Sequence, residues 1–487
     1  VFAFVVLGAA AVWLGGLNQD EGWYLYAAKM VAEGKMLYRD FFFTQGPEMP
    51  EFYKAFIWAW GSWGLLGARV FTLMIGFVGI FFSVCLAQRL APKGCKSEAA
   101  LIAFLLLGCN LYHLYYVAIP KTYALASMWV MSGFLVLSYW SKKPIALIIA
   151  GFALAFAAGT RISLGAILCV IGLWMLGSRQ WKSLLWFCVG GFGGLALVYG
   201  PYLCDAGARE GLIAAQQYHA ARGGFDIVWA VGSLSRLVRW YLPVFVVFGL
   251  GVAGIVKSKS GVEVEQRNIL HLLLFSFLAV FAVQMLAPFP YEDYQVPIMG
   301  LLAVYAAVAF VGNSDTPLFD FDSRLRLLLV LGLCFANSFG SPLLEKWMTN
   351  GQDRFWSLKK EKCEMAQLRD VAKRIEAQDP GGKTLLTQDL YLAIETGRTV
   401  PKGLEMGPFA MLTDEEWRKL LTETAPAECR IAALSGYAFA IEPPVCKERS
   451  VEKQMEYWTL LKQCYKLVDR EELFGQNATT LLMLKRK

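Results

Sequence analysis

The sequence predicts a polytopic α-helical membrane protein that ends in a smaller, water-soluble α/β domain. Of its 487 residues, 56% are hydrophobic and only 17% are charged, and the mean hydropathy is +0.45. Soluble globular chains carry roughly 25% charged and 45–50% apolar residues, so the composition excludes that class. Apolar stretches follow one another up to residue 341, whereas the remainder is mixed and polar. We therefore predict a membrane domain over 1–341 and a soluble domain over 342–487.

The apolar stretches set the number of predicted membrane spans. A helix needs about 20 mainly apolar residues to cross a bilayer, and eleven stretches qualify. They are 1–17, 64–87, 99–118, 122–140, 144–159, 162–177, 183–203, 237–256, 269–287, 294–312 and 325–341. Two of them, 144–159 and 162–177, are short, so a bent or re-entrant path is the alternative there.

The distribution of basic residues predicts the orientation. Twelve Lys and Arg lie in five alternate loops: Arg89, Lys93, Lys96, Lys142, Lys143, Arg179, Lys182, Lys257, Lys259, Arg267, Arg324 and Arg326. Short cytoplasmic loops carry this excess, so the N-terminus is predicted inside and, with an odd number of spans, the C-terminal domain outside. The net charge of +7 arises largely in such loops, so nucleic acid is not predicted as a partner.

Cysteine and histidine usage bears on disulfides and metals. Four of the eleven cysteines, Cys363, Cys429, Cys446 and Cys464, lie in the predicted outer domain. An even number in an oxidising compartment permits disulfides, and we expect Cys429 to pair with Cys446. The chain has three histidines and no Cys-x-x-Cys pair, so a histidine-based zinc site is not expected.

The segment after the first span has the pattern of an amphipathic helix. Apolar residues stand at 23, 26, 27, 30 and 31, and Asn18 with Glu21 forms a predicted capping box. We expect this helix to lie along the outer membrane surface, apolar face down, with Asp20 and Glu21 in its first turn. The two acids then either complement the helix dipole or supply a general base at the membrane–water boundary.

The rest of this outer loop, up to residue 63, is longer than a connection requires. It is dense in aromatic and charged residues and contains a second amphipathic piece over 50–60. Ordered loops of such length are usually functional, which favours the second interpretation of the acids.

Here the chain resembles the GT-C glycosyltransferases, including protein O-mannosyltransferases and aminoarabinose transferases of lipid A. Asp20-Glu21-Gly22 and AEGKMLYRDFFFTQGP (32–47) are similar to the family's first periplasmic loop. Gly67-Ala68-Arg69, GFALAFAAGTRIS (151–163) and YEDYQVPIMGLLAVYAA (291–307) follow in the family's order. The resemblance covers the first 340 residues. It implies a GT-C fold, a bacterial inner membrane location and a polyprenyl-phosphate-linked sugar as donor.

The resemblance also implies a catalytic centre. An acid in the first outer loop is central in the family, which makes Asp20 the candidate base and Glu21 its neighbour. The chain departs from relatives at Gln45-Gly46-Pro47, where many have Lys-Pro-Pro, and at Lys121-Thr122, where an acid is common. These departures bear on the identity of the donor.

The reaction requires cations for the lipid-phosphate leaving group. The outward-side candidates are Arg39, Arg69, Lys121, Arg161 and Arg222. Each has a structural alternative, such as snorkelling, helix capping or a solvated surface charge. Arginine binds phosphate bidentately, which favours Arg161 and Arg39 over Lys121.

Further residues are expected on the acceptor side of the site or in support of it. They are Tyr24, Gln45, Glu48, His219, Glu292, Asp293 and Tyr294. The acceptor hydroxyl is expected on a glycan, a lipid or a protein, with membrane lipids as surrounding partners. No metal site is predicted from the residues, and the first loop has no Asp-x-Asp pair. A divalent cation nevertheless stays open as a cofactor, because some GT-C enzymes use one.

Two other classes of function compete with a transferase. A transporter or flippase of a lipid-linked or small substrate predicts internal repeats and charges near the membrane midplane, and no convincing repeat is present. A non-catalytic membrane subunit of a larger complex is the third interpretation.

The soluble domain is predicted from shorter patterns. Helices are expected over 361–377 and 450–464, strands over 431–435 and 480–485, and a strand, helix and turn over 382–407. No nucleotide-binding glycine motif occurs there, so we expect a cover over the acceptor or a partner surface.

Overall fold

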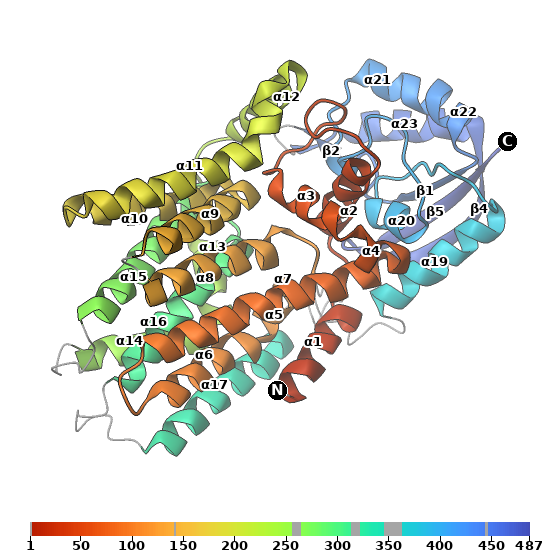
Figure 1. The fold of residues 1–487 in the computed structure, drawn as a ribbon. Coiled ribbons are helices and arrows are strands. Elements are labelled where there is room, and N and C mark those ends of the chain that lie inside the picture. Colours follow the sequence, from red (N-terminus) through yellow and green to blue (C-terminus); the bar gives the residue numbers. More distant parts are fainter. Residues whose placement is uncertain (1, 141–142, 256–263, 313–321, 345–362, 444–446) are drawn as a thin grey trace.

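The computed structural model describes residues 2–140, 143–255, 264–312, 322–344, 363–443 and 447–487. Apolar helices form a bundle, and a smaller α/β unit packs beside one end of it (Figure 1). The apolar helices are α1 (Phe2–Leu14), α5 (Gly64–Leu90), α6 (Lys96–Gly108), α7 (Leu111–Ala118), α8 (Thr122–Trp140), α9 (Pro144–Thr160), α10 (Gly165–Gly177), α11 (Trp181–Cys204), α14 (Leu242–Ile255), α15 (Val264–Met285), α16 (Met299–Val311) and α17 (Ser323–Leu344). The predicted fold class, a polytopic helical membrane protein with a small C-terminal sheet, is confirmed.

The predicted spans coincide with these helices. By length and composition, five described helices can cross a membrane, or seven if each of two bent pairs counts as one span. One bend, of 69°, separates α6 from α7 inside the stretch 99–118. Asn110 caps α7 there by accepting a hydrogen bond from the His113 backbone N–H. The count of eleven spans and the orientation stay predictions, as does the domain division, whose boundary falls within α17.

Glycines let α9 and α11 approach each other closely. A Cβ on Gly190 would lie 2.1 Å from the Ile148 carbonyl oxygen, and one on Gly151 would lie 2.5 Å from that of Phe187. Real Cβ atoms do not tolerate such distances, so only glycine permits this contact. The pair α9 and α11 thereby forms a fixed wall beside the first outer loop.

The first outer loop folds into short helices at the end of the bundle. These are α2 (Gln19–Ala32), α3 (Glu48–Ala55), α4 (Ile57–Trp60) and the 3-10 helix η1 (Gly61–Trp63). The capping box at α2 is confirmed, because the Asn18 side chain accepts from the helix and the Glu21 carboxylate accepts from the Asn18 N–H at 2.8 Å.

The expected position of α2 on the membrane surface is wrong. Ten of its fourteen residues are buried, so both faces are covered by protein. The second cover is the C-terminal unit: a Cβ on Gly22 would lie 2.5 Å from the Tyr391 backbone nitrogen. Val400 N–H donates to the Tyr26 hydroxyl at 2.9 Å, and the Lys29 ammonium donates to the Gly397 carbonyl at 2.7 Å. Gly22, Tyr26 and Lys29 are spaced along one helical face, which is the face that meets the C-terminal unit.

The C-terminal unit contains a three-stranded antiparallel sheet in the order β1-β5-β4 and a small pair of strands, β2 and β3. The strands are β1 (Ile431–Ser435), β2 (Ile441–Glu442), β3 (Lys447–Glu448), β4 (Tyr465–Phe474) and β5 (Thr479–Arg486). The helices are α19 (Glu364–Gln378), α20 (Leu390–Glu395), η4 (Gly407–Phe409), α21 (Asp414–Lys419), η5 (Leu420–Thr424), α22 (Ala425–Glu428) and α23 (Val451–Cys464).

The sequence predicted most of this unit. Both helices and both strands expected there are present, whereas β4 had not been expected. The segment 382–407 contains α20, but its extended part makes only isolated bridges, at Thr384 and Leu386. Cys446 lies outside the described residues, and so does its expected disulfide with Cys429.

Three further elements lie at the end of the bundle that carries the first outer loop or just beside it. They are α12 (Ala206–Ala220), α13 (Ile227–Trp240) and the 3-10 helix η3 (Glu292–Ile298). A short 3-10 turn, η2 (Ile162–Leu164), joins α9 to α10. These junctions and the N-terminus of α2 carry the polar side chains described next.

Candidate active site

Asp20 is the second residue of α2, and its carboxylate is held by two neighbours. The Lys121 ammonium lies 2.9 Å from Oδ2, and the Trp23 indole N–H donates to Oδ1 at 3.1 Å. Burial alone would raise the pKa of Asp20, but the Lys121 charge and these hydrogen bonds together hold it below its usual range. The side chain keeps 31% of its surface accessible. Asp20 is therefore an ionised carboxylate that a ligand can reach.

Lys121 connects Asp20 to a second carboxylate from a distant part of the chain. Its Nζ lies 3.3 Å from Oδ2 of Asp293, which begins η3 with Glu292. The Tyr123 hydroxyl donates to the same oxygen at 2.7 Å. Burial would lower the pKa of Lys121, yet the surrounding acids, Asp20 first, raise it well above its usual value. The result is a charged network of Asp20, Lys121, Asp293 and Tyr123.

Arg161 lies beside this network at the junction of α9 and η2. Its Nη1 donates to the Thr122 hydroxyl at 3.1 Å. Its Cζ lies 5.0 Å from the centre of the Tyr123 ring and 4.8 Å from that of Tyr294, within cation–π range. The ring of Tyr24 stacks on that of Trp23, with 3.8 Å between the ring centres. Burial raises the pKa of Tyr24, while the charge of Arg161 lowers it and that of Asp20 raises it. The aromatic rings thus fix the guanidinium beside Tyr123, whose hydroxyl donates to Asp293 of the network.

Two residues at the end of α12 also approach the site. Arg222 lowers the pKa of Asp20 through its charge, and its Cζ lies 5.9 Å from the Phe289 ring. His219 Nε2 lies 2.7 Å from the Thr44 carbonyl oxygen, so that side chain ties α12 to the first loop. The pKa of His219 is lowered, mainly because its ring is buried.

The expected roles of Glu21 and Arg69 have to be revised. Neither side chain has any exposed surface, and they form a two-point ion pair at 2.6 and 2.7 Å. The Arg69 guanidinium also donates to the carbonyls of Val12, Gly15 and Gly16 at 2.8 to 3.1 Å. All five N–H donors of the guanidinium are then in use, so none is left for a phosphate. The pair anchors the N-terminus of α2 to α5.

Other predicted site residues lie apart from the network. Arg39 is 45% exposed and pairs with Asp40 and Asp205 at the surface. The Glu292 carboxylate pairs with Arg236 of α13 at 3.0 Å, and the Gln45 carbonyl accepts from Tyr38. The functional roles expected for Arg39, Glu292 and Gln45 stay predictions.

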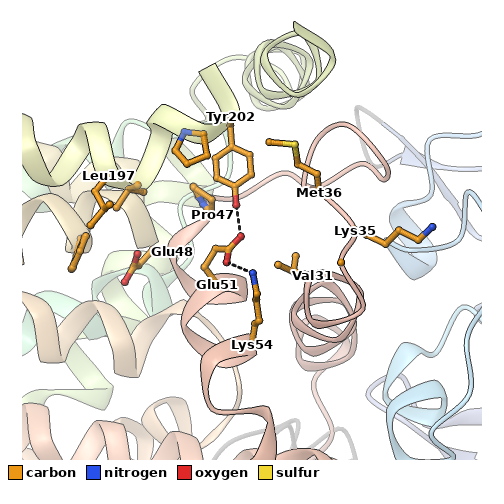
Figure 2. A pocket seen from close by; sticks show the side chains of 13 residues that line it. Val31, Lys35, Met36, Pro47, Glu48, Glu51, Lys54, Leu197 and Tyr202 are labelled. Atoms are coloured by element: carbon orange, nitrogen blue, oxygen red, sulfur yellow. Dashed lines mark hydrogen bonds and ion pairs between the residues drawn. The ribbon is translucent and has the colours of Figure 1, made fainter. Parts of the chain in front are cut away.

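Glu48 faces a cavity of about 410 Å³ between the first loop and the wall of α9 and α11 (Figure 2). Apolar side chains such as Phe156, Leu197 and Val198 line it next to Glu48. Glu51 also lines it, but its carboxylate accepts from Tyr202 at 2.6 Å and pairs with Lys54 at 3.1 Å. Burial, and then the Glu51 charge, raises the pKa of Glu48 to about 8.

Neither Arg69 nor Arg161, two of the cations predicted for the lipid phosphate, lines this cavity. The loop next to the cavity contacts the end of α9, which leads to Arg161. Gly46 packs so closely against α9 that a Cβ on it would lie 1.9 Å from the Gly159 carbonyl oxygen. Gly159 precedes Arg161 by two residues, so the loop that carries Glu48 also supports Arg161.

Solved structures share this architecture. ArnT from Cupriavidus metallidurans, solved bound to undecaprenyl phosphate, matches with a TM-score of 0.62 and 13% identity, over 99% of this chain and 96% of that chain. An oligosaccharyltransferase from Archaeoglobus fulgidus, solved with zinc and sulfate, matches with a TM-score of 0.54 and 12% identity, over 99% of this chain and 72% of that chain. The chain has a GT-C fold. No protein-family model and no curated protein sequence matches it.

Sequence reasoning missed three residues of the candidate site: Trp23, Thr122 and Tyr123. Tyr123 and Thr122 follow Lys121 directly, so a search of both sides of that outer junction would have found them. Trp23 follows Asp20 by one helical turn, and an i, i+3 hydrogen bond is typical at that spacing.

Proposed function

We propose that the chain is an integral-membrane glycosyltransferase that moves a sugar from a polyprenyl-phosphate donor to an acceptor hydroxyl, with Asp20 as general base. The observation that carries the proposal is the accessible Asp20 carboxylate in one network with Lys121, Asp293 and Tyr123, with the Arg161 guanidinium packed on the Tyr123 ring, on a GT-C fold. We place the reaction on the extracytoplasmic side of a bacterial inner membrane, following the positive-inside pattern of the loops. The undecaprenyl phosphate bound by ArnT supports a polyprenyl phosphate as the lipid.

The proposed step needs one proton acceptor and one anion site. The acceptor oxygen forms a bond to the anomeric carbon while its proton passes to Asp20. The bond between the anomeric carbon and the phosphate oxygen breaks, and the lipid phosphate keeps the electron pair. Its growing negative charge needs fixed cations nearby. Asp20, Asp293 and Lys121 together carry one net negative charge, so we assign the phosphate to the guanidinium of Arg161 beside Tyr123, and we expect Arg222, whose charge acts on Asp20, to contribute.

The arrangement favours a transferase over a transporter. The charged side chains of the network and that of Arg161 come from helix junctions, namely the N-terminus of α2, the turn before α8, the start of η3 and, for Arg161, the end of α9. A transport path would place them at broken helices near the membrane midplane. We assign the C-terminal unit to the acceptor side, because it covers the outer face of the helix that bears Asp20.

The test is the substitution Asp20→Asn in purified protein. Release of undecaprenyl phosphate is measured from a panel of undecaprenyl-phosphate sugars in the presence of membrane-derived acceptors. Loss of a general base should slow the reaction by roughly 10²–10⁴-fold, with thermal stability close to that of the parent protein. Glu33→Gln, at the exposed end of α2, is the matched control and should keep full activity. Near-normal turnover of Asp20→Asn would remove Asp20 from this role.

A further inference from the structure

The point between Asp20 and Asp293 is a place where a GT-C enzyme could hold a metal ion. Two carboxylates from segments far apart in sequence converge on it, and such oxygen ligands suit a divalent cation. One of the structural neighbours was solved with zinc. In this chain the same point is filled by the Lys121 ammonium, at 2.9 Å from one carboxylate and 3.3 Å from the other. The residues therefore do not fit a metal ion there.

Lys121 is fixed in this place by its surroundings. The residue is 5% exposed and belongs to the short turn between α7 and α8. Its backbone N–H donates to the Ile119 carbonyl at 2.7 Å, and its Nζ lies 4.9 Å from the centre of the Tyr123 ring. An ammonium paired with two carboxylates in this way carries a positive charge near neutral pH, and that charge repels any divalent cation that approaches them.

We infer that Lys121 is a built-in cation that takes the place of a divalent metal between Asp20 and Asp293, so that the site works without metal. This inference rests on the proposed transferase function and extends it. Lys121 acts through Asp20, which makes it a positioning residue: it orients the carboxylate by the ion pair and leaves the second oxygen to Trp23. Removal of the ammonium leaves two facing carboxylates, which is an incomplete cation site.

The first experiment measures metal binding without any enzymatic assay. Mn²⁺ binding to purified, EDTA-stripped protein is followed by electron paramagnetic resonance. The parent protein and Lys121→Arg should bind no ion at this point, whereas Lys121→Ala and Lys121→Asp should bind one. The additional change Asp293→Asn in Lys121→Ala should abolish that binding. Equal Mn²⁺ binding by the parent protein and Lys121→Ala, with both carboxylates required, would overturn the inference.

The second experiment uses sugar transfer. The parent protein should keep its rate within twofold in excess EDTA, and Lys121→Ala should lose at least tenfold and regain at least part of that loss with millimolar Mn²⁺ or Mg²⁺. An EDTA-sensitive parent protein would refute the inference. If Lys121→Ala does not fold, Mn²⁺ binding by Lys121→Asp and the response of the parent protein to EDTA test the inference instead. If no variant transfers sugar but the Mn²⁺ pattern holds, the proposed reaction fails and the built-in cation stands.

Discussion

Glu21 and Arg69 form an ion pair that has no contact with solvent, with Oε1 of Glu21 2.6 Å from Nη2 of Arg69. Asp20, the adjacent residue, is instead 31% exposed and points to Lys121. Neighbouring residues on a helix project about 100° apart, so the two acids serve different purposes. Glu21 holds the helix in place, and this leaves Asp20 on the face that ligands can reach.

Loss of one partner of this pair should destabilise the protein strongly. Arg69→Met leaves the buried Glu21 carboxylate without its cation, and such a loss costs about 3–5 kcal/mol. We expect a large fall in the thermal midpoint in detergent, measured by intrinsic fluorescence. The double variant Glu21→Leu, Arg69→Met should be more stable than Arg69→Met alone, because no buried charge is left over. An Arg69→Met protein as stable as its parent would contradict the anchoring role.

Arg161 should contribute directly to binding of the lipid phosphate. A hydrogen bond to a charged group contributes about 1.5–3 kcal/mol, so Arg161→Ala should weaken undecaprenyl phosphate binding roughly 10- to 100-fold. Arg161→Lys should recover only part, because lysine lacks the planar fork that matches phosphate. Microscale thermophoresis in detergent measures both. Arg209→Ala, an exposed arginine of α12, is the control and should bind as the parent does. Unchanged affinity in Arg161→Ala would exclude it as a phosphate ligand.

The sequence predicted local features of the site better than its assembly. The capping box at Asn18 and Glu21 and the position of Asp20 in the first turn depend on residues three apart, so both could be predicted. The pairing of Lys121 with Asp20 and Asp293 joins three segments that meet only in the folded bundle. No spacing between residues in the sequence predicts that these three side chains lie in contact.

Two errors have a common physical origin. A basic residue near the outer end of a span has the same sequence pattern whether it snorkels to a headgroup or is buried, so the sequence left Arg69 among the candidates for the phosphate. An amphipathic helix likewise has the same pattern whether its second face meets lipid or protein. The C-terminal unit that covers Gly22 and Tyr26 could not be placed on α2 from the sequence.

The contact between α2 and the C-terminal unit should be sensitive to one methyl group. Gly22→Ala places a Cβ 2.5 Å from the Tyr391 nitrogen and 2.9 Å from the Leu390 carbonyl carbon. Overpacking of this kind costs about 1–3 kcal/mol, and the shift of α2 should also reduce transfer. Gly177→Ala is the matched control, because a Cβ there meets nothing within 4 Å. Thermal melts and limited proteolysis of the two variants test the contact. Equal thermal midpoints and equal cleavage rates would show that the Tyr391 backbone moves away from a Cβ at residue 22 without cost.

Glu48 should make stability depend on pH in a direction opposite to that of a paired carboxylate. Its pKa in the folded protein is raised to about 8, above the ordinary value of 4.5. Between these values the folded protein keeps a proton that the unfolded chain has lost, so the Glu48 contribution is full below pH 4.5 and falls as the pH rises toward 8. The slope is at most about 1.4 kcal/mol per pH unit. Glu48→Gln, which cannot ionise, should lose this dependence.

Thermal midpoints of the parent protein and Glu48→Gln, measured from pH 5 to pH 9 in one detergent, give the difference directly. Glu48→Gln should gain stability relative to the parent as the pH rises, because the parent must either hold a charge among Phe156, Leu197 and Val198 or open the cavity. Glu48→Asp keeps a carboxyl group and should retain a pH dependence of the same sign. If parent and Glu48→Gln differ by the same amount at every pH, Glu48 does not keep its proton in the folded state, and the cavity in Figure 2 holds an ionised carboxylate.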